Sequence, residues 1–228
     1  MRSAIALGLL CVASAAPAQD LPLDRLAAGD RAEVVRIASD PTVRARVPAQ
    51  RVRCRPATYR RLLAELPLAA RWLRALDLGD YAIEDLPAGG FRVDDRAGAR
   101  ARCRRALDER GLLVVVARGT LDVRALPTIR GAGVITVRYA ALPDDPRRLR
   151  ARAEVAFRVE SGLLHLVTRP FERLLERVLA AKLAALVRSA TALAEAIERD
   201  PTGTYERLRA AGAASSDLEA YRERFLAF

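Results

Sequence analysis

The chain has 228 residues, of which 51% are hydrophobic and 5% aromatic, and its formal net charge is +11 at pH 7. This length fits one single-core domain with appendages, and after residue 18 no apolar segment is long enough to cross a membrane. The scarcity of aromatic side chains argues against a base-stacking surface, so we expect no nucleic-acid partner. The net positive charge suggests an anionic membrane surface as a second candidate partner, and the mixing of arginine with acidic residues along the whole chain weakens that suggestion.

Residues 1 to 18 have the composition of a cleavable export signal. Arg2 gives a positive start, Ala4 to Val12 form an apolar run too short to span a bilayer, and Ala16-Pro17-Ala18 is a small-x-small cleavage site. Cys11 lacks the small preceding residue that is normal for a lipidated cysteine. We therefore predict a soluble periplasmic or secreted protein that is cleaved after Ala18.

Two cysteines, Cys54 and Cys103, remain after this cleavage. Because an exported protein meets an oxidising compartment, we predict a disulfide between them. Closing a loop of about 50 residues would stabilise the fold by roughly 4 kcal/mol in the chain-entropy model. Two buried thiols are the alternative. With two cysteines and one histidine, His165, we expect no zinc site, no other metal site and no cofactor.

The first half of the mature chain has helical signals. Asp30 can cap a short helix that ends before Asp40-Pro41, within an N-terminal extension of residues 19–50. From Pro56 to Leu76 apolar residues recur at helical spacing, with a break or a second helix start at Pro67. Trp72 falls between the spacing classes, as a core aromatic or one at the edge of a groove.

From Tyr81 to Glu160 the apolar period changes to two, with turn residues at regular intervals, which predicts an antiparallel sheet with one face in water. A long helix, Phe171 to Arg199, then presents a broad apolar stripe that would cover the other face. Thr204–Ala213 and Asp217–Leu226 are expected to form two short terminal helices. The fold class is therefore α+β, with a curved antiparallel sheet covered by a long C-terminal helix.

This order of elements resembles the helix-grip fold of the START and polyketide-cyclase-like superfamily over residues 51–200. The local features that carry the resemblance are Phe91-x-Val93-Asp94, Gly119 at a strand end, and the closing helix after Glu160. The resemblance implies a cavity between helix and sheet for apolar ligands such as lipids, sterols or aromatic polyketides. The export signal (1–18), the extension (19–50) and the tail (201–228) depart from a typical cytosolic member.

Lys182 lies in the middle of the apolar stripe of the long helix, and Ser189 lies on the same line two turns further on. An unpaired ammonium is costly to bury, so Lys182 needs an anion, a depressed pKa or a route to water. It can bind the anionic head of a ligand, pair with an acidic side chain of the sheet, or act as a reactive amine. His165, between apolar residues, is read as a core or boundary histidine. The candidate residues for the apolar part of the ligand site are Val115, Val137, Phe157, Leu175, Val178, Leu186 and Trp72.

Three functions remain open on this basis. The sequence assigns no catalytic residue, and the first function needs none. The first is an exported, non-catalytic carrier or sequestering protein for an apolar or amphipathic, lipid-like molecule. The second is an envelope interaction protein with a filled cavity, which holds a partner or an anionic membrane surface through its arginine-rich surface and the tail Tyr221–Phe228. The third is a small-molecule enzyme, such as a cyclase or hydrolase, that uses Lys182 or His165.

Overall fold

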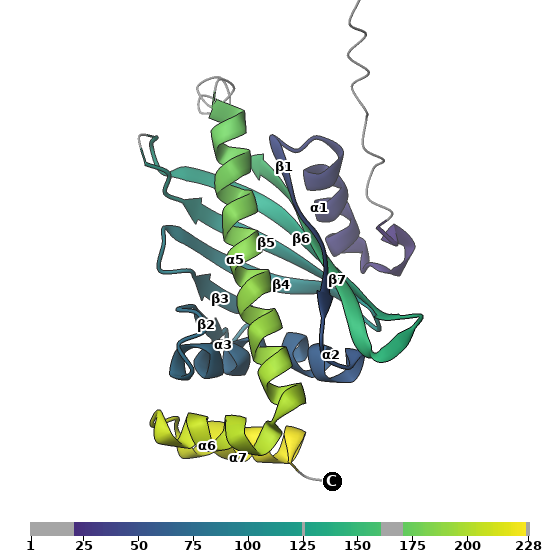
Figure 1. The fold of residues 1–228 in the computed structure, drawn as a ribbon. Coiled ribbons are helices and arrows are strands. Elements are labelled where there is room, and N and C mark those ends of the chain that lie inside the picture. Colours follow the sequence, from purple (N-terminus) through teal and green to yellow (C-terminus); the bar gives the residue numbers. More distant parts are fainter. Residues whose placement is uncertain (1–20, 125, 161–170, 227–228) are drawn as a thin grey trace, which may run out of the picture.

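A computed structural model describes residues 21–124, 126–160 and 171–226 of the chain. Its centre is a curved antiparallel sheet of seven strands in the order β1-β7-β6-β5-β4-β3-β2 (Figure 1). The predicted export signal, His165 and Phe228 lie outside the described residues. The strands are β1 (Val43–Val52), β2 (Ala82–Asp85), β3 (Phe91–Asp94), β4 (Ala99–Glu109), β5 (Leu112–Leu121), β6 (Ile129–Leu142) and β7 (Asp145–Val159).

Strand β1 belongs to the sheet, although the sequence analysis places its residues mainly in the N-terminal extension. It pairs with β7 from Val43, opposite Phe157, to Val52, opposite Leu149. The register shifts between Val47 and Gln50, around Pro48. Proline cannot donate to a strand ladder, and an edge strand with a bulge accommodates it. The folded domain therefore begins before residue 51.

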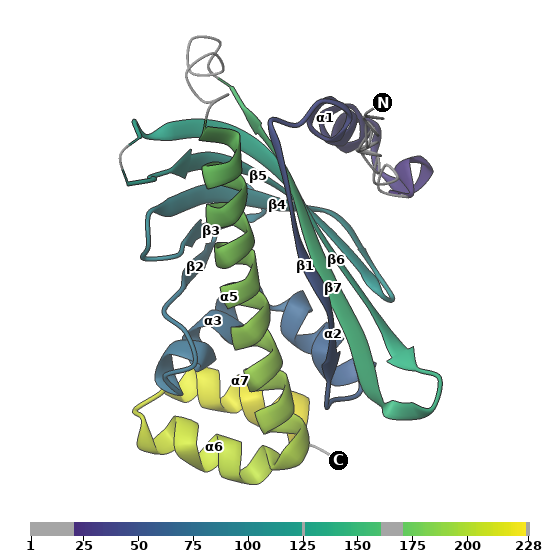
Figure 2. The same cartoon turned by 45° about the horizontal axis from the view of Figure 1, so that its top comes forward.

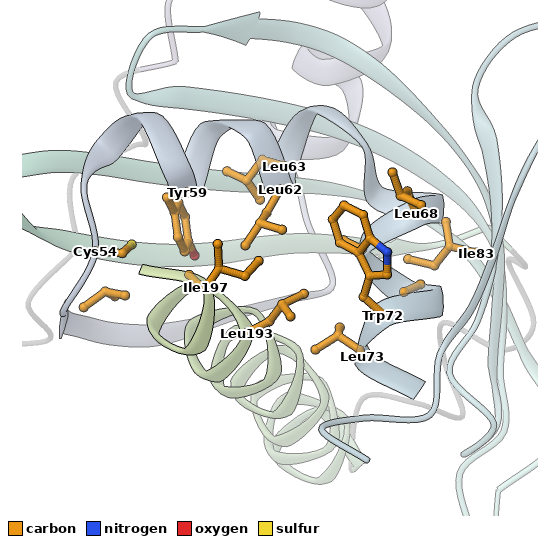
Figure 3. Close-up of a cluster of buried hydrophobic side chains, with 14 of the residues drawn as sticks. Cys54, Tyr59, Leu62, Leu63, Leu68, Trp72, Leu73, Ile83, Leu193 and Ile197 are labelled. Carbon is orange, nitrogen blue, oxygen red and sulfur yellow. The ribbon is translucent and has the colours of Figure 1, made fainter. Parts of the chain in front are cut away.

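Helix α5 (Glu172–Arg199) crosses the concave face of the sheet (Figure 1). This confirms the long covering helix that the apolar stripe predicts. Leu183 and Val187 pack on Ala45 of the edge strand β1 and Val155 of its neighbour β7, in one hydrophobic cluster. At the C-terminal end of α5, Leu193, Ala194 and Ile197 pack against α2 (Pro56–Ala64) and α3 (Leu66–Ala75) (Figure 3). The helix ends at Asp200, whose side chain accepts a hydrogen bond from the Gly203 amide and so caps the next helix.

Helix α1 (Ala28–Ser39) packs on the opposite, convex face of the sheet, which the sequence predicts to be in water (Figure 2). Val34 and Ile37 are fully buried there, beside Val114 and Val134. These strand residues are apolar at the even positions as well as the odd ones, so both faces of β5 and β6 need a cover. The prediction of one wet face is therefore wrong for the middle of the sheet.

The terminal helices α6 (Pro201–Ala210) and α7 (Ser215–Phe225) close the end of the domain near α3. Tyr221 and Phe225 are 0% and 5% exposed, and their rings meet Trp72 edge-on at centroid distances of 5.3 and 5.9 Å. The Trp72 indole N–H donates to the carbonyl of Asp217 over 3.3 Å. Tyr221 and Phe225 are core residues, so they are not available to hold a partner as the interaction-protein hypothesis requires.

Candidate functional site

Part of the concave face is apolar but incompletely covered. In β3, β5, β6 and the part of β4 before its bulge at Arg105/Leu107, the odd-numbered residues face α5, α2 and α3, because strand side chains alternate. Five of these side chains are only partly buried, although they lie near the centre of the sheet. We call them the concave apolar surface: Val93, Ala101, Ala117, Ile135 and Val137.

Small residues limit how far the side chains of this surface project from the sheet. Ala101 lies opposite Gly119, and Ala117 lies opposite Cys103 on one side and Gly133 on the other. The Phe157 ring lies over the adjoining strand, where a Cβ added to Gly131 would collide with it. Because these positions are alanine or glycine, few side-chain atoms of β4 to β6 fill the space beneath α5.

Lys182 lies at the border of this region, where it connects α5 to the turn between β3 and β4. Its ammonium donates to Asp95 Oδ2 over 2.6 Å and to the carbonyl of Ala97 over 2.7 Å. Asp95 Oδ1 accepts from the amides of Ala97 and Ala99, so the same carboxylate organises the turn and binds the lysine. The side chains of Lys182 and Asp95 are 21% and 13% exposed. Of the roles left open for Lys182, this geometry corresponds to pairing with an acidic side chain of the sheet.

The predicted residues for the apolar part of the site differ in burial, and the remaining two predicted residues, Ser189 and Trp72, lie away from it. Val115 and Leu175 are fully packed core residues, at 5% and 1% exposure. Partly buried positions are Val137, Phe157, Val178 and Leu186.

Ser189 and Trp72 lie elsewhere. Ser189 faces Gly79, where an added Cβ would come within 2.8 Å of its Oγ, whereas Lys182 faces the β3–β4 turn. Seven residues of helix separate the two side chains by roughly 10 Å along the axis. Trp72 packs against α7 and does not belong to the concave apolar surface.

Sequence reasoning missed Asp95 as the partner of Lys182, and it missed Val93, Ala101, Ala117 and Ile135. The alternation of β4 already places Ala101 and Cys103 on one face, which is a signal for this surface. No local pattern identifies Asp95, because its contact with Lys182 spans 87 residues.

The predicted disulfide is not formed, since Cys54 and Cys103 are both buried free thiols. Cys54 follows β1, whereas Cys103 lies in β4, and three strands separate β1 from β4 in the sheet. Bridged cysteines need Cα atoms within about 7 Å, which is less than two strand spacings. Burial raises the pKa of both thiols to about 12, with a smaller contribution at Cys54 from the Glu198 and Glu195 carboxylates.

A separate cavity of about 310 Å³ lies between α2, α3 and α7. Two ion pairs belong to its lining: Arg71 Nε lies 2.9 Å from Asp217 Oδ2, and Arg224 lies 2.5 Å from Glu65. Asp85 and Arg105 also line this cavity, so its wall is charged, and the concave apolar surface is the stronger candidate for an apolar ligand. Within the described residues there is no group of three or more His, Cys, Asp or Glu suited to a metal ion, and no helix long and apolar enough to cross a membrane.

Comparison with known proteins finds no matching family model and no matching curated protein. Among solved structures, a hypothetical protein from Helicobacter pylori is 10% identical, with a TM-score of 0.46 over 69% of this chain and 91% of its own. A protein from Thermus thermophilus is 10% identical, with a TM-score of 0.35 over 75% of this chain and 99% of its own.

The di-domain ARO/CYC protein BexL, from the BE-7585A biosynthetic pathway, is 15% identical, with a TM-score of 0.40. The match covers 71% of this chain and 52% of BexL. At these identities the likenesses concern the fold alone. The helix-grip arrangement of this chain, a curved antiparallel sheet held by one long helix, rests on its own strand order and on α5.

Proposed function

We propose that this protein binds an apolar or amphipathic, lipid-like small molecule between α5 and the sheet, and carries or sequesters it outside the cytoplasm without converting it. The observation that carries the proposal is the concave apolar surface, whose five side chains are partly exposed on the face that α5 crosses. Apolar side chains at the centre of a sheet gain free energy when they are covered. A ligand that removes about 200 Å² of apolar area from water would gain roughly 5 kcal/mol from this term.

The position of Lys182 supports an amphipathic ligand with an anionic head. A lysine ammonium has three N–H donors, and Asp95 and Ala97 take two of them. The third donor is available to a carboxylate or phosphate at the border of the concave apolar surface. In this proposal the head group shares the ammonium with Asp95, and the tail lies over Ala117, Ile135 and Val137.

Binding without chemistry is favoured over catalysis by the state of the nearby titratable groups. The Lys182 ammonium is engaged in an ion pair with Asp95 over 2.6 Å. Burial raises the pKa values of Tyr59 and Tyr139 above the ordinary tyrosine value, so both phenols stay neutral at physiological pH. Tyr59 and Tyr139 are 2% and 5% exposed core residues, so neither phenol is placed to react with a ligand.

Displacement of 1-anilinonaphthalene-8-sulfonate by dodecanoate and by dodecanol tests the proposal, because the two probes share a chain and differ in charge. Ala117→Phe places a ring beside Gly133 on the concave apolar surface. It is expected to lower the binding affinity for dodecanoate and for dodecanol at least tenfold. Ala140→Phe, at an exposed position on the other face of β6, is the matched control and should bind both probes normally.

Native mass spectrometry of the protein purified from its own envelope would then identify the bound molecule. Equal binding by Ala117→Phe and the unchanged protein would place the ligand elsewhere. Failure of the unchanged protein to bind either probe, together with a clean apo mass, would refute the carrier function.

A further inference from the structure

Arginine side chains are gathered on the convex face of the sheet, next to the part that α1 covers. The even-numbered residues of β3, β5, β6 and the part of β4 before its bulge point to this face. Arg92 lies opposite Arg102, and Arg102 lies opposite Arg118, so three neighbouring strands present a row of arginines. We call the following set the convex arginine patch: Arg92, Arg100, Arg102, Arg118 and Arg130.

This arrangement is unfavourable for the folded chain by itself. Like charges directly opposite each other on neighbouring strands destabilise a sheet, because their Cβ atoms are only about 5 Å apart. Arg118 is neutralised by Glu33 and Glu160, at 2.6 and 3.1 Å. Arg92 and Arg102 form no ion pair with any described residue, although Glu84 lies opposite Arg92 on β2.

The patch is accessible to a large partner. Arg92, Arg102 and Arg130 are exposed, whereas α1 packs beside them over β5, β6 and β7 and reaches Arg118 through Glu33. Four carboxylates adjoin the five arginines: Glu33 and Glu160 bind Arg118, Asp94 binds Arg100 at 3.3 Å, and Glu84 lies opposite Arg92. Among the described residues Arg92, Arg102 and Arg130 have no ion-pair partner, so these three charges are available to an anionic partner.

The positions of the aromatic residues in the sheet distinguish between two polyanionic partners, a single-stranded nucleic acid and an anionic bilayer. Phe91, Tyr139 and Phe157 are the aromatic residues of the seven strands, and all three occupy odd positions on the concave side. Single-stranded nucleic acids are held by aromatic side chains that stack on bases, and the convex arginine patch has none. Phosphate groups in a plane, as on a bilayer, need only the charges.

We infer that the convex arginine patch docks the protein on the surface of an anionic phospholipid membrane. This inference goes beyond the proposed ligand binding and does not depend on it. Docking through the convex face leaves α5 and the concave apolar surface on the far side of the sheet, facing away from the headgroups (Figure 2). A ligand can therefore stay bound while the protein is attached to the membrane.

Sedimentation of the full-length chain with phospholipid vesicles tests the docking surface. Vesicles of equal parts phosphatidylcholine and phosphatidylglycerol are compared with vesicles of phosphatidylcholine alone, and an apolar N-terminal run would bind both kinds alike. Each arginine near an anionic surface contributes about 1 kcal/mol, so Arg92→Gln with Arg102→Gln should weaken binding to the anionic vesicles roughly 30-fold. Added salt should weaken it as well.

The matched control is Arg188→Gln with Arg207→Gln, which removes the same charge from exposed positions on α5 and α6. This control pair should retain full binding, and the unfolding midpoint of the patch variant should stay the same or rise. Equal binding to both vesicles, or equal loss in the control pair, would overturn the inference. Tighter binding to a single-stranded oligonucleotide than to anionic vesicles would also overturn it, in favour of a nucleic-acid surface.

Discussion

Replacing Lys182 with methionine should destabilise the fold by about 2 kcal/mol. Removing one partner of a fully buried ion pair costs 3–5 kcal/mol, and exposed pairs contribute about 0–1 kcal/mol. The Lys182 and Asp95 side chains are 21% and 13% exposed, which places the pair between these limits. The substitution also removes the 2.7 Å hydrogen bond to the Ala97 carbonyl. For a domain of this size the unfolding midpoint should fall by roughly 4–8 °C.

Urea unfolding of Lys182→Met, Asp95→Asn and the double variant measures the pair directly. Asparagine keeps an acceptor oxygen for the amides of Ala97 and Ala99, so the turn stays capped while the charge is removed. We expect a coupling free energy of about 1–2 kcal/mol between the two positions. Arg188→Met, at an exposed position on the same helix, should change the unfolding free energy by less than about 0.5 kcal/mol.

Two results would refute this reasoning. A coupling free energy near zero would mean that the contact between Lys182 and Asp95 does not hold the β3–β4 turn to α5. If Lys182→Met leaves the free energy of unfolding unchanged, this contact does not stabilise the fold. If the variant folds and binds dodecanol but no longer prefers dodecanoate, Lys182 also serves the ligand head group.

Three further predictions concern the core and the surface. Because burial raises the pKa of Cys54 and Cys103 from 9.0 to about 12, the folded state holds these protons more tightly than the unfolded state, so stability should be constant below pH 9 and fall between pH 9 and 12. Urea midpoints measured across this pH range should show the fall, and it should shrink when both cysteines are replaced by alanine. Phe225→Ala should cost about 3–5 kcal/mol, because the ring is 5% exposed and packs on Trp72; thermal unfolding measures this loss. Arg102→Gln should raise the unfolding free energy by about 0.2–1 kcal/mol in urea, since it relieves the opposition with Arg92 and Arg118.

Each of these predictions has its own contrary result. Rising stability above pH 9, or rapid alkylation of Cys54 and Cys103 in the folded protein, would contradict their burial. A cost below 1 kcal/mol for Phe225→Ala would mean that α7 is only loosely attached, and Arg222→Ala, at an exposed position on α7, is its control. Loss of stability in Arg102→Gln would show that the arginine row is held by contacts that favour folding.

Local patterns in the sequence were enough to predict the elements that depend on neighbouring residues. The apolar stripe predicts a helix from Phe171 to Arg199, and α5 spans Glu172–Arg199. The strand alternation predicts a curved antiparallel sheet, and the break at Pro67 matches the start of α3 at Leu66. Periodicity of 3.6 or 2 and the backbone limits of proline act within a few residues, so these features can be read without knowing the fold.

Contacts between distant segments were decided only by the tertiary structure. Strand order places three strands between β1 and β4, so Cys54 and Cys103 remain free thiols. The sheet face that α1 covers and the burial of Phe225 against Trp72 depend on how whole elements pack.

The same holds for the partner of Lys182. The helical wheel shows that this lysine needs an anion, a depressed pKa or a route to water, and only the fold brings Asp95 to it across 87 residues of chain. A residue's own sequence neighbourhood sets which face it occupies, whereas its contacts depend on which other face is folded against it.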